Sequence, residues 1–281
     1  KKCPIKSFDV IMGNPPYNQG GIKSFKGTDG EKTKTIWPLF IIESFEILKQ
    51  NGFLLFINPL SWLRVSHNVH KLLIEKHIFW LKLWDNSMSK TKIQADIPLS
   101  VFVLQNKENL SKNKTTIISE MARQGIKSEA NIYLNPEESI PLAYHNLFDI
   151  LSTKIKSNPE LVLSVKANKV KGNGTSFVLP KTYSVLDNLG VDTYTIKEGL
   201  KVKYMSKKHQ DTEKNKLIIA NKTGFNGSFI DTGKLGLVGN DKFYILGEKL
   251  ELLQKFFNTK LAKILANNTK YRQDFLDAEV F

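Results

Sequence analysis

The stretch that decides the fold is FDVIMGNPPY, residues 8–17. Residues 8–12 are apolar with one exception and stop at Gly13, which is typical of a short buried strand. Two successive prolines end any strand, and neither of their nitrogens can donate a main-chain hydrogen bond. The sequence therefore predicts a buried strand that opens directly into a rigid turn at residues 14–17.

The next part of the chain alternates between helix and strand patterns. In order, it predicts a helix from about 35 to 50 that is stopped by Asn51-Gly52, a strand at 53–57, a helix at 67–76, and strands at 79–84 and 99–104. This rhythm is typical of an α/β sheet with buried parallel strands.

The rhythm changes beyond about residue 106. The predicted elements are a hairpin-like region at 114–134, an amphipathic helix at 137–157, strands at 216–220, 228–230 and 242–246, and a final helix at about 248–267. We therefore predict two parts: residues 1–135, with a partial Rossmann-like α/β sheet, and residues 136–281, a smaller α+β domain.

The chain is basic, with a net charge of +14 and a pI near 9.6, which indicates a polyanionic partner. Residues 151–281 carry 22 Lys and Arg against 13 Asp and Glu, a net of +9, so this part is the better candidate for a nucleic-acid surface. The lysines that could follow DNA phosphates are Lys201, Lys203, Lys207, Lys208, Lys216 and Lys222.

Other classes of protein are excluded by composition. A single cysteine, Cys3, excludes a disulfide framework and a multi-cysteine zinc site. His67 and His70 are spaced to share a helix face, but no carboxylate completes a ligand set, so no metal is expected. No apolar stretch reaches the roughly 20 residues that span a bilayer. We expect a cytoplasmic protein with no membrane partner.

The turn at residues 14–17 suits methylation of a planar, conjugated amino group. The lone pair of such a nitrogen is delocalised, so the nitrogen is a poor nucleophile. Two acceptors on its hydrogens, the Asn14 side-chain oxygen and the Pro15 carbonyl, favour a more pyramidal and electron-rich nitrogen. Pro16 holds the direction of that carbonyl, and Tyr17 can lie against the face of an extruded base.

FDVIMGNPPY resembles the catalytic motif of N6-adenine DNA methyltransferases of restriction–modification systems. FIIESFEILKQNGFLLFINPLSWL and IPLSVFVLQN resemble the family's next helix and strand and its late strand, and the tail after residue 216 is similar to its target-recognition domain. The resemblance implies transfer of a methyl group from S-adenosylmethionine to N6 of a flipped adenine in double-stranded DNA. It implies that Asn14, Pro15, Pro16 and Tyr17 are catalytic, and that Asn14 and Pro16 also contact the cofactor.

The chain departs from the family at the cofactor loop. The family's glycine-rich loop should precede the Asn-Pro-Pro-Tyr turn, yet only seven residues precede Phe8. Downstream, Gly224 to Gly227 is the glycine-rich candidate, but a strand and turn follow it rather than a helix, so the loop-to-helix logic fails. We expect the C-terminal portion of a larger protein, or a subunit that another chain completes.

Two alternatives stay open from the sequence. One is a non-catalytic DNA-recognition subunit that needs a partner for the cofactor site. The other is a methyltransferase acting on a glutamine side chain or on guanine of ribosomal RNA, since such enzymes share a similar turn. The long basic segment that follows the sheet favours DNA.

Overall fold

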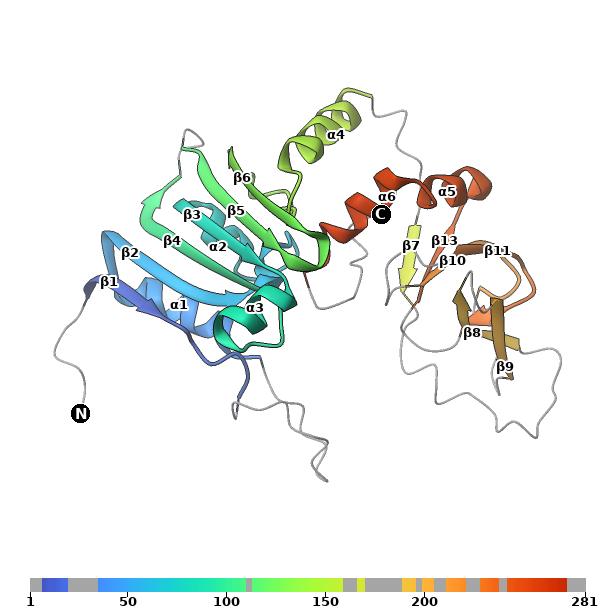
Figure 1. Cartoon of the computed structure of the whole chain (residues 1–281), viewed down its shortest axis with the longest axis horizontal. Helices are drawn as coiled ribbons and strands as arrows, with labels where there is room; N and C mark the ends of the chain where they lie inside the picture. Colours follow the sequence, from blue (N-terminus) through green and yellow to red (C-terminus); the bar gives the residue numbers. More distant parts are fainter. Residues whose placement is uncertain are drawn as a thin grey trace. The chain divides into compact units, whose positions relative to one another are not determined.

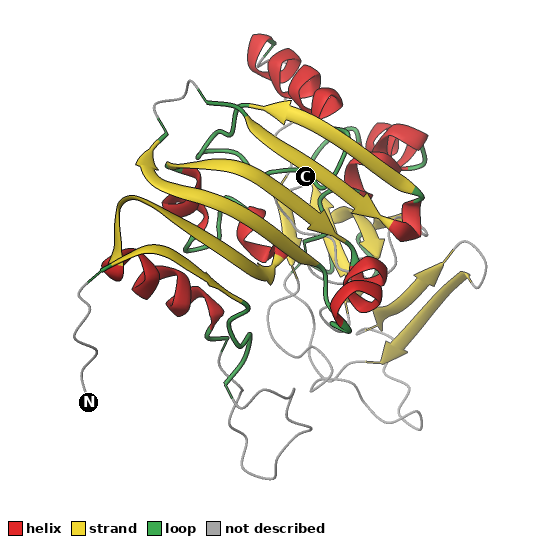
Figure 2. Cartoon of the chain, turned by 60° about the vertical axis from the view of Figure 1, so that its left-hand side comes forward, coloured by secondary structure: helices red, strands yellow, loops and turns green. Residues whose placement is uncertain are grey.

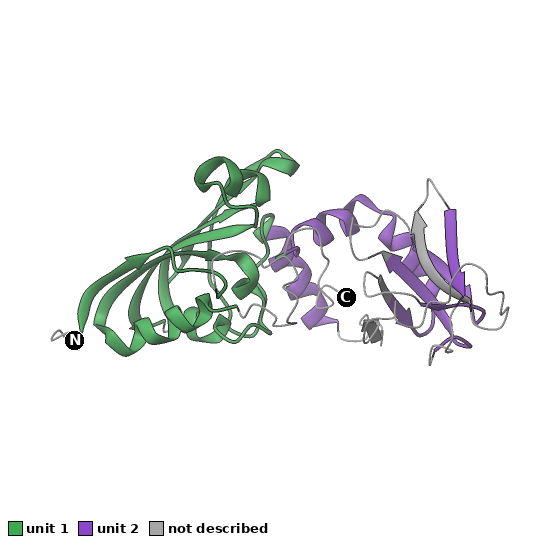
Figure 3. Cartoon of the chain, turned by 90° about the horizontal axis from the view of Figure 1, so that it is seen from below, with its two compact units in different colours: residues 1–145, 271–273 green, residues 146–270, 274–281 purple. Residues whose placement is uncertain are grey.

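The computed structural model describes residues 7–19, 35–109, 113–158, 166–169, 189–195, 199–204, 211–220, 228–237 and 242–271. The chain divides into two compact units, residues 1–145 with 271–273 and residues 146–270 with 274–281 (Figure 3). Each unit is described by itself. The assignment of a catalytic half and a recognition domain to the two parts of the chain stays a prediction.

A six-stranded sheet is the centre of unit 1 (Figure 1). Its strands are β1 (Phe8–Gly13), β2 (Leu48–Pro59), β3 (Lys76–Trp84), β4 (Leu99–Glu108), β5 (Thr115–Met121) and β6 (Ile126–Ile132). Their order across the sheet is β1-β2-β4-β3-β5-β6. The four strands and the hairpin that the sequence predicted are confirmed as elements, and Gly125 turns the hairpin with a φ of 64°. The burial predicted for residues 8–12 was wrong, because β1 is an edge strand and none of its residues is buried.

The strand directions give the sheet a common edge. β1 is parallel to β2 and β3 is parallel to β5, whereas β4 is antiparallel to both β2 and β3. The expectation of parallel strands was therefore wrong for β4, because an apolar run indicates burial and not direction. The carboxyl ends of β1, β2, β3 and β5 lie along the same edge.

Helices cover the inner face of the sheet. They are α1 (Trp37–Ile47) and α2 (His70–Ile74), with α3 (Asn86–Ile93) and the 3-10 turns η1 (Leu60–Leu63) and η2 (Ala122–Gln124) at strand ends. Trp37 of α1 and Leu73 of α2 are buried in one core with inner-face residues such as Phe102. The sequence reading missed α3, whose N-terminus is capped by the Asp85 carboxylate.

The predicted helix stop at Asn51-Gly52 was wrong. α1 ends at Ile47, and the following residues already belong to β2, where its pairing with β1 is interrupted by a bulge. A Cβ on Gly52 would lie 2.9 Å from the main-chain oxygens of both Asp9 and Lys49. Only glycine leaves room for this close approach of the two strands.

Unit 2 is built from short strands and helices. Its elements are α4 (His145–Ser157), which starts at the unit boundary, β7 (Lys166–Lys169), β8 (Leu189–Thr195), β9 (Gly199–Tyr204), β10 (Asn215–Ala220), β11 (Ser228–Thr232), β12 (Gly236–Leu237), β13 (Lys242–Leu246), α5 (Leu250–Phe257) and α6 (Lys260–Asn267). One sheet has the order β11-β10-β13-β7 and the other has the order β12-β8-β9. Figure 2 shows the helices of the chain in red and its strands in yellow.

The strands predicted at 216–220, 228–230 and 242–246 are confirmed, but both predicted helices of this half need correction. The helix expected at 248–267 is two helices, because the Thr259 hydroxyl accepts from the Ala262 amide and starts a new one. The helix expected at 137–157 begins only at His145. Among the described residues, no helix is long and apolar enough to cross a bilayer.

Candidate active site

The Asn-Pro-Pro-Tyr turn lies directly beyond the carboxyl end of β1. Strand β1 ends at Gly13, and the parallel strand β2 ends nearby at Pro59. Ligands of open α/β sheets bind beyond the carboxyl ends of their strands. The sequence therefore places Asn14 and Tyr17 at the edge where such a sheet holds its ligands.

The turn is anchored by one proline and exposes the residues around it. Pro15 is buried, whereas Asn14 and Pro16 are exposed and Tyr17 is partly buried. The main-chain oxygen of Tyr17 accepts a hydrogen bond from the Ile36 amide at 3.1 Å, so the turn is also tied to the start of α1. The exposed groups are thus held on a fixed backbone.

One hydrogen bond links the two side chains predicted to act on the base. The Tyr17 hydroxyl donates to Asn14 Oδ1 at 2.8 Å. Burial raises the pKa of Tyr17 to about 12, so this hydroxyl stays protonated near neutral pH. The bond orients the Asn14 amide and uses one of the two acceptor positions of its oxygen. The second position remains for an incoming N–H group.

The described residues fit a methyl acceptor better than a methyl donor. Asn14 and the Pro15 carbonyl could receive the two hydrogens of an amino group, and the exposed Asn14 and Pro16 could contact a donor bound beside it. No glycine-rich loop between a strand and a helix occurs within the described ranges of the chain. Gly224 to Gly227 lies outside the described residues, although the strand predicted after it is confirmed as β11.

Asp9 belongs to the same strand as the turn but does not lie near it. It stands at the amino-terminal end of β1, five residues before Asn14, which corresponds to roughly 16 Å along a strand. Its exposed carboxylate forms an ion pair with Lys49 at 2.9 Å. Asp9 is therefore a residue of an edge strand and is remote from the turn.

Two other predicted roles can be compared with the structure. Phe102 is fully buried and contacts the Trp62 ring edge-on, so it belongs to the core of unit 1. His70 is also fully buried, with its Nδ1 atom 2.9 Å from the Trp62 carbonyl oxygen, while His67 stacks on Trp37. The two histidines therefore serve packing in unit 1.

The lysines predicted to contact DNA fall into three groups. Lys201 and Lys203 lie on β9 and are exposed. Lys207, Lys208 and Lys222 lie outside the described residues. Lys216 cannot reach a phosphate, because it is fully buried in β10, and its interpretation as a phosphate ligand was wrong.

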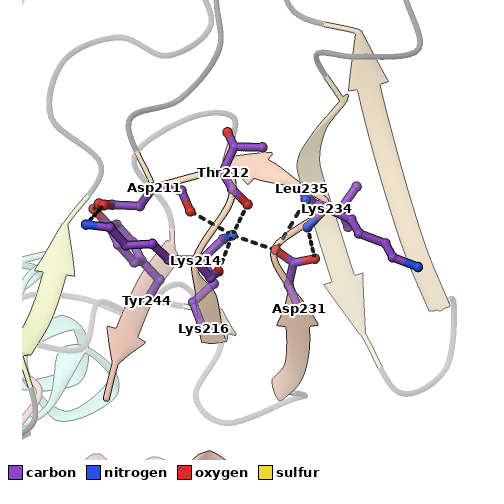
Figure 4. Close-up of polar contacts among 8 residues, drawn as sticks. All are labelled: Asp211, Thr212, Lys214, Lys216, Asp231, Lys234, Leu235 and Tyr244. Atoms are coloured by element: carbon purple, nitrogen blue, oxygen red, sulfur yellow. Dashed lines mark hydrogen bonds and ion pairs between the residues drawn. The ribbon is translucent and has the colours of Figure 1, made fainter. Parts of the chain in front are cut away.

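Lys216 is instead the centre of a buried polar network in unit 2 (Figure 4). Its ammonium group forms an ion pair with Asp231 and donates to the main-chain oxygens of Asp211 and Thr212, at 3.0 and 3.1 Å, and of Lys214. The Asp231 carboxylate also accepts from the main-chain amides of residues 234 and 235. The network thus ties the turn before β10 to the turn after β11.

The sequence reading missed a polar cluster at the same edge of the sheet as Asn14. At the carboxyl ends of β3 and β5, the Glu120 carboxylate accepts from Trp84 Nε1 at 2.8 Å and forms an ion pair with Lys82 at 3.0 Å. Hydrogen bonds from Lys82 and Trp84 hold the pKa of Glu120 below its ordinary value, against the opposing effect of burial. The period-2 pattern of the hairpin strand could have revealed that Glu120 faces outward with Lys82.

The mixed α/β fold of the chain is shared with a much larger restriction–modification enzyme. The solved structure of the type IIL enzyme MmeI, determined in complex with DNA, superposes with a TM-score of 0.56 at 9% identity. The superposition covers 95% of this chain and 45% of that chain. At this identity the likeness concerns the fold alone.

Sequence comparison relates the chain to restriction–modification methylases. Residues 5–88 match the family model of the Eco57I restriction-modification methylase. A protein of Mycoplasma pneumoniae described as an uncharacterized adenine-specific methylase is 27% identical over 133 residues, which are 44% of this chain and 29% of that protein. The resemblance drawn from FDVIMGNPPY is confirmed. The chain spans less than half the length of both proteins it matches.

Proposed function

We propose that this chain supplies the base-binding site and a DNA-binding region of an S-adenosylmethionine-dependent N6-adenine DNA methyltransferase of the restriction–modification type. The observation that carries the proposal is the Asn-Pro-Pro-Tyr turn at the carboxyl end of β1, with Pro15 buried and Asn14 exposed. The family match over residues 5–88 includes this turn and supports the proposal.

The first role of the turn is to hold the amino group. The Oδ1 atom of Asn14 and the carbonyl oxygen of Pro15 would each accept one N6 hydrogen. Both acceptors sit on a backbone that two prolines make rigid, so they need little rearrangement as positive charge develops on the nitrogen. That charge strengthens both hydrogen bonds in the transition state, and the proton lost afterwards can pass to solvent.

The second role is to hold the ring of a flipped base. Tyr17 would lie against its face, and base–aromatic stacking of this kind contributes about 1–3 kcal/mol per base. The hydrogen bond to Asn14 fixes the phenol ring and the amide together, so stacking and amino-group binding are oriented by one contact. A base out of register with Tyr17 would also miss the acceptors.

S-adenosylmethionine would supply an electrophilic methyl group on a sulfonium centre. From this chain, Asn14 and Pro16, which are both exposed, would contact it. Because the chain spans less than half the length of these two matched proteins, we infer that further polypeptide supplies the main cofactor contacts. The need for further polypeptide also supports a second candidate function, a DNA-recognition subunit that is catalytically inactive without its partner.

Unit 2 would contact the DNA. Lys201 and Lys203 project from β9, and Lys207, Lys208 and Lys222 are near them in sequence. Contacts from such lysines to phosphates give affinity that falls with salt concentration. We expect sequence reading to depend on other groups, since phosphate contacts alone carry no base information.

The test measures transfer of radioactive methyl groups to duplex DNA by the complete natural protein or complex that contains these residues, followed by nucleoside analysis. We expect N6-methyladenine, and a loss of about 100-fold or more for Asn14→Ala because one of two acceptors is removed. DNA binding should stay unchanged in this variant.

Asn131→Ala is a matched control. Asn131 is an exposed asparagine of the same sheet, and its Oδ1 atom also accepts from a hydroxyl, that of Thr116 at 2.7 Å. Its loss should leave transfer unchanged. Methylation of RNA or protein instead of DNA, or full activity of Asn14→Ala, would refute the proposed function.

A further inference from the structure

The 3-10 turn η1 lies at the edge of the sheet that carries the Asn-Pro-Pro-Tyr turn. Strand β2 is parallel to β1, and η1 begins directly after the carboxyl end of β2. Leu60 and Trp62 of η1 are fully buried in the core of unit 1. Tyr17, at the end of the Asn-Pro-Pro-Tyr turn, packs against the same core. This core therefore supports the ring that would stack on the flipped base.

The segment by which the chain leaves unit 1 is bound to residues of the same edge. The Ile140 amide donates to the Leu63 carbonyl oxygen at 2.9 Å, and the Val65 amide donates to the Ser139 hydroxyl at 3.0 Å. His145, the last residue of this segment in unit 1, is only 4% exposed. Domain boundaries normally fall in exposed linkers. The chain leaves unit 1 through a buried segment instead.

Tyr271 is the residue by which the chain returns to unit 1. Helix α6 ends at Asn267, and residues 271–273 belong to unit 1 again. The side chain of Tyr271 is only 3% exposed and is part of the same core as Trp62 and Ile140. The core that holds η1 therefore includes a residue that follows the whole of unit 2 in the chain.

The ring of Tyr271 has a structural effect on its surroundings. Fixing a segment in one conformation costs conformational entropy, so the burial of Tyr271 indicates favourable packing of its ring. Protein cores are packed as densely as organic crystals, and a cavity left by a missing ring shifts its neighbours. Catalytic groups tolerate little of this, since a displacement of about 1 Å can lower a rate about 100-fold.

We propose that Tyr271 is a positioning residue of the candidate active site. By filling the core that η1 and Tyr17 share, its ring holds the carboxyl ends of β1 and β2 in the geometry that methyl transfer needs. The inference rests on the proposed function for the reaction that is affected. It adds a residue far outside residues 5–88, which match the family model.

A purely structural role of Tyr271 would have different consequences. If the ring served only the stability of unit 1, its replacement would lower the fraction of folded protein and leave the kcat of the folded protein unchanged. A positioning role lowers kcat even when all of the protein is folded. The KM for DNA distinguishes both cases from a change in DNA binding.

The first test measures methyl transfer to duplex DNA by the complete natural protein or complex, at a temperature where tryptophan fluorescence shows that unit 1 of every variant is folded. In Tyr271→Ala we expect kcat to fall at least about tenfold while the KM for DNA stays within about twofold. Tyr271→Phe keeps the volume of the ring and should restore kcat to within about twofold.

Tyr133→Ala is the matched control, because Tyr133 is a tyrosine of unit 1 that is 58% exposed, and its kcat should stay unchanged. Tyr271→Leu leaves a smaller cavity and replaces Tyr271→Ala if the latter does not fold. An unchanged kcat in the folded alanine or leucine variant would overturn the proposal.

The second test needs no catalysis and uses amide hydrogen exchange in the 281-residue chain. The Ile36 amide donates to the Tyr17 carbonyl oxygen at 3.1 Å, so its exchange reports how firmly the turn is held. It should exchange at least about tenfold faster in Tyr271→Ala and at the wild-type rate in Tyr133→Ala. Equal exchange in all three proteins would refute the role of Tyr271. Faster exchange in Tyr271→Ala, together with no DNA methylation by the complete wild-type assembly, would refute the proposed function and leave the link between Tyr271 and the turn intact.

Discussion

The ion pair of Lys216 and Asp231 gives the sharpest prediction for stability. Neither side chain is accessible to solvent beyond 2%, and the ammonium group of Lys216 has four acceptors around it. Lys216→Met would leave the Asp231 carboxylate buried without its counter-ion and three main-chain oxygens without this donor. Removing one partner of a buried pair costs about 3–5 kcal/mol.

The matched control is Lys214→Met in the same turn. Lys214 also forms an ion pair, with Asp211 at 2.7 Å, but its side chain is 61% exposed. Pairs of this kind contribute less than about 1 kcal/mol. Asp231→Asn combined with Lys216→Met should recover part of the loss, because the uncompensated charge is gone while an acceptor for the following turn remains.

The assay is urea unfolding followed with two probes. All four tryptophans, Trp37, Trp62, Trp80 and Trp84, belong to unit 1, so their fluorescence reports that unit, while amide hydrogen exchange of β10 reports unit 2. Lys216→Met should lower the midpoint of unit 2 by about 2 M urea and leave the fluorescence transition in place. A loss as small as that of Lys214→Met would refute the view that this network holds unit 2 together.

Three further predictions concern unit 1. Tyr17→Phe should keep base stacking but lower methyl transfer by about fivefold, because an orienting hydrogen bond is worth about 1 kcal/mol. Tyr17→Ala should lose at least about ten times more, and equal losses would contradict the separate roles of ring and hydroxyl. Burial lowers the pKa of His145 to about 4, so about 3 kcal/mol of stability is fully present above pH 6.5 and is lost as pH falls toward 4. In His145→Leu the urea midpoint should depend less on pH across this range. An unchanged pH profile would contradict the burial of a neutral imidazole. Gly52→Ala should lower the free energy of unfolding by about 1–3 kcal/mol, followed by tryptophan fluorescence, because its Cβ would collide with main-chain oxygens including that of Asp9. An unchanged free energy would show that the β1–β2 bulge relaxes freely.

Local signals in the sequence were enough to locate β1 and its turn, but not to show that β1 is an exposed edge strand. An apolar run, a glycine and two prolines leave a single interpretation, and the structure places Asn14 where that interpretation requires. The direction of β4 could not be predicted in the same way, because Leu99–Glu108 has the apolar pattern of a buried strand whichever way it runs.

Non-local partners explain the other errors. Lys216 stands in a lysine-rich stretch and reads as a surface residue, and only the fold brings the Asp231 carboxylate to it from 15 positions away. The break between α5 and α6 depends on one hydroxyl, that of Thr259, within a pattern that is otherwise continuous. Neither feature changes the period of the apolar residues, so the pattern of hydrophobicity could not show them.

The hydrogen bond between Tyr17 and Asn14 also sets which chemical groups the site would accept. The Tyr17 hydroxyl donates to Asn14 Oδ1, and this bond holds the Asn14 amide with its oxygen toward the hydroxyl and keeps that position an acceptor. Two fixed acceptors repel a carbonyl, which would exclude the keto groups of thymine and guanine without any contact to the rest of the base. Cytosine and guanine carry an amino group as well, so their rejection would depend on the rest of the base, including the ring that Tyr17 covers.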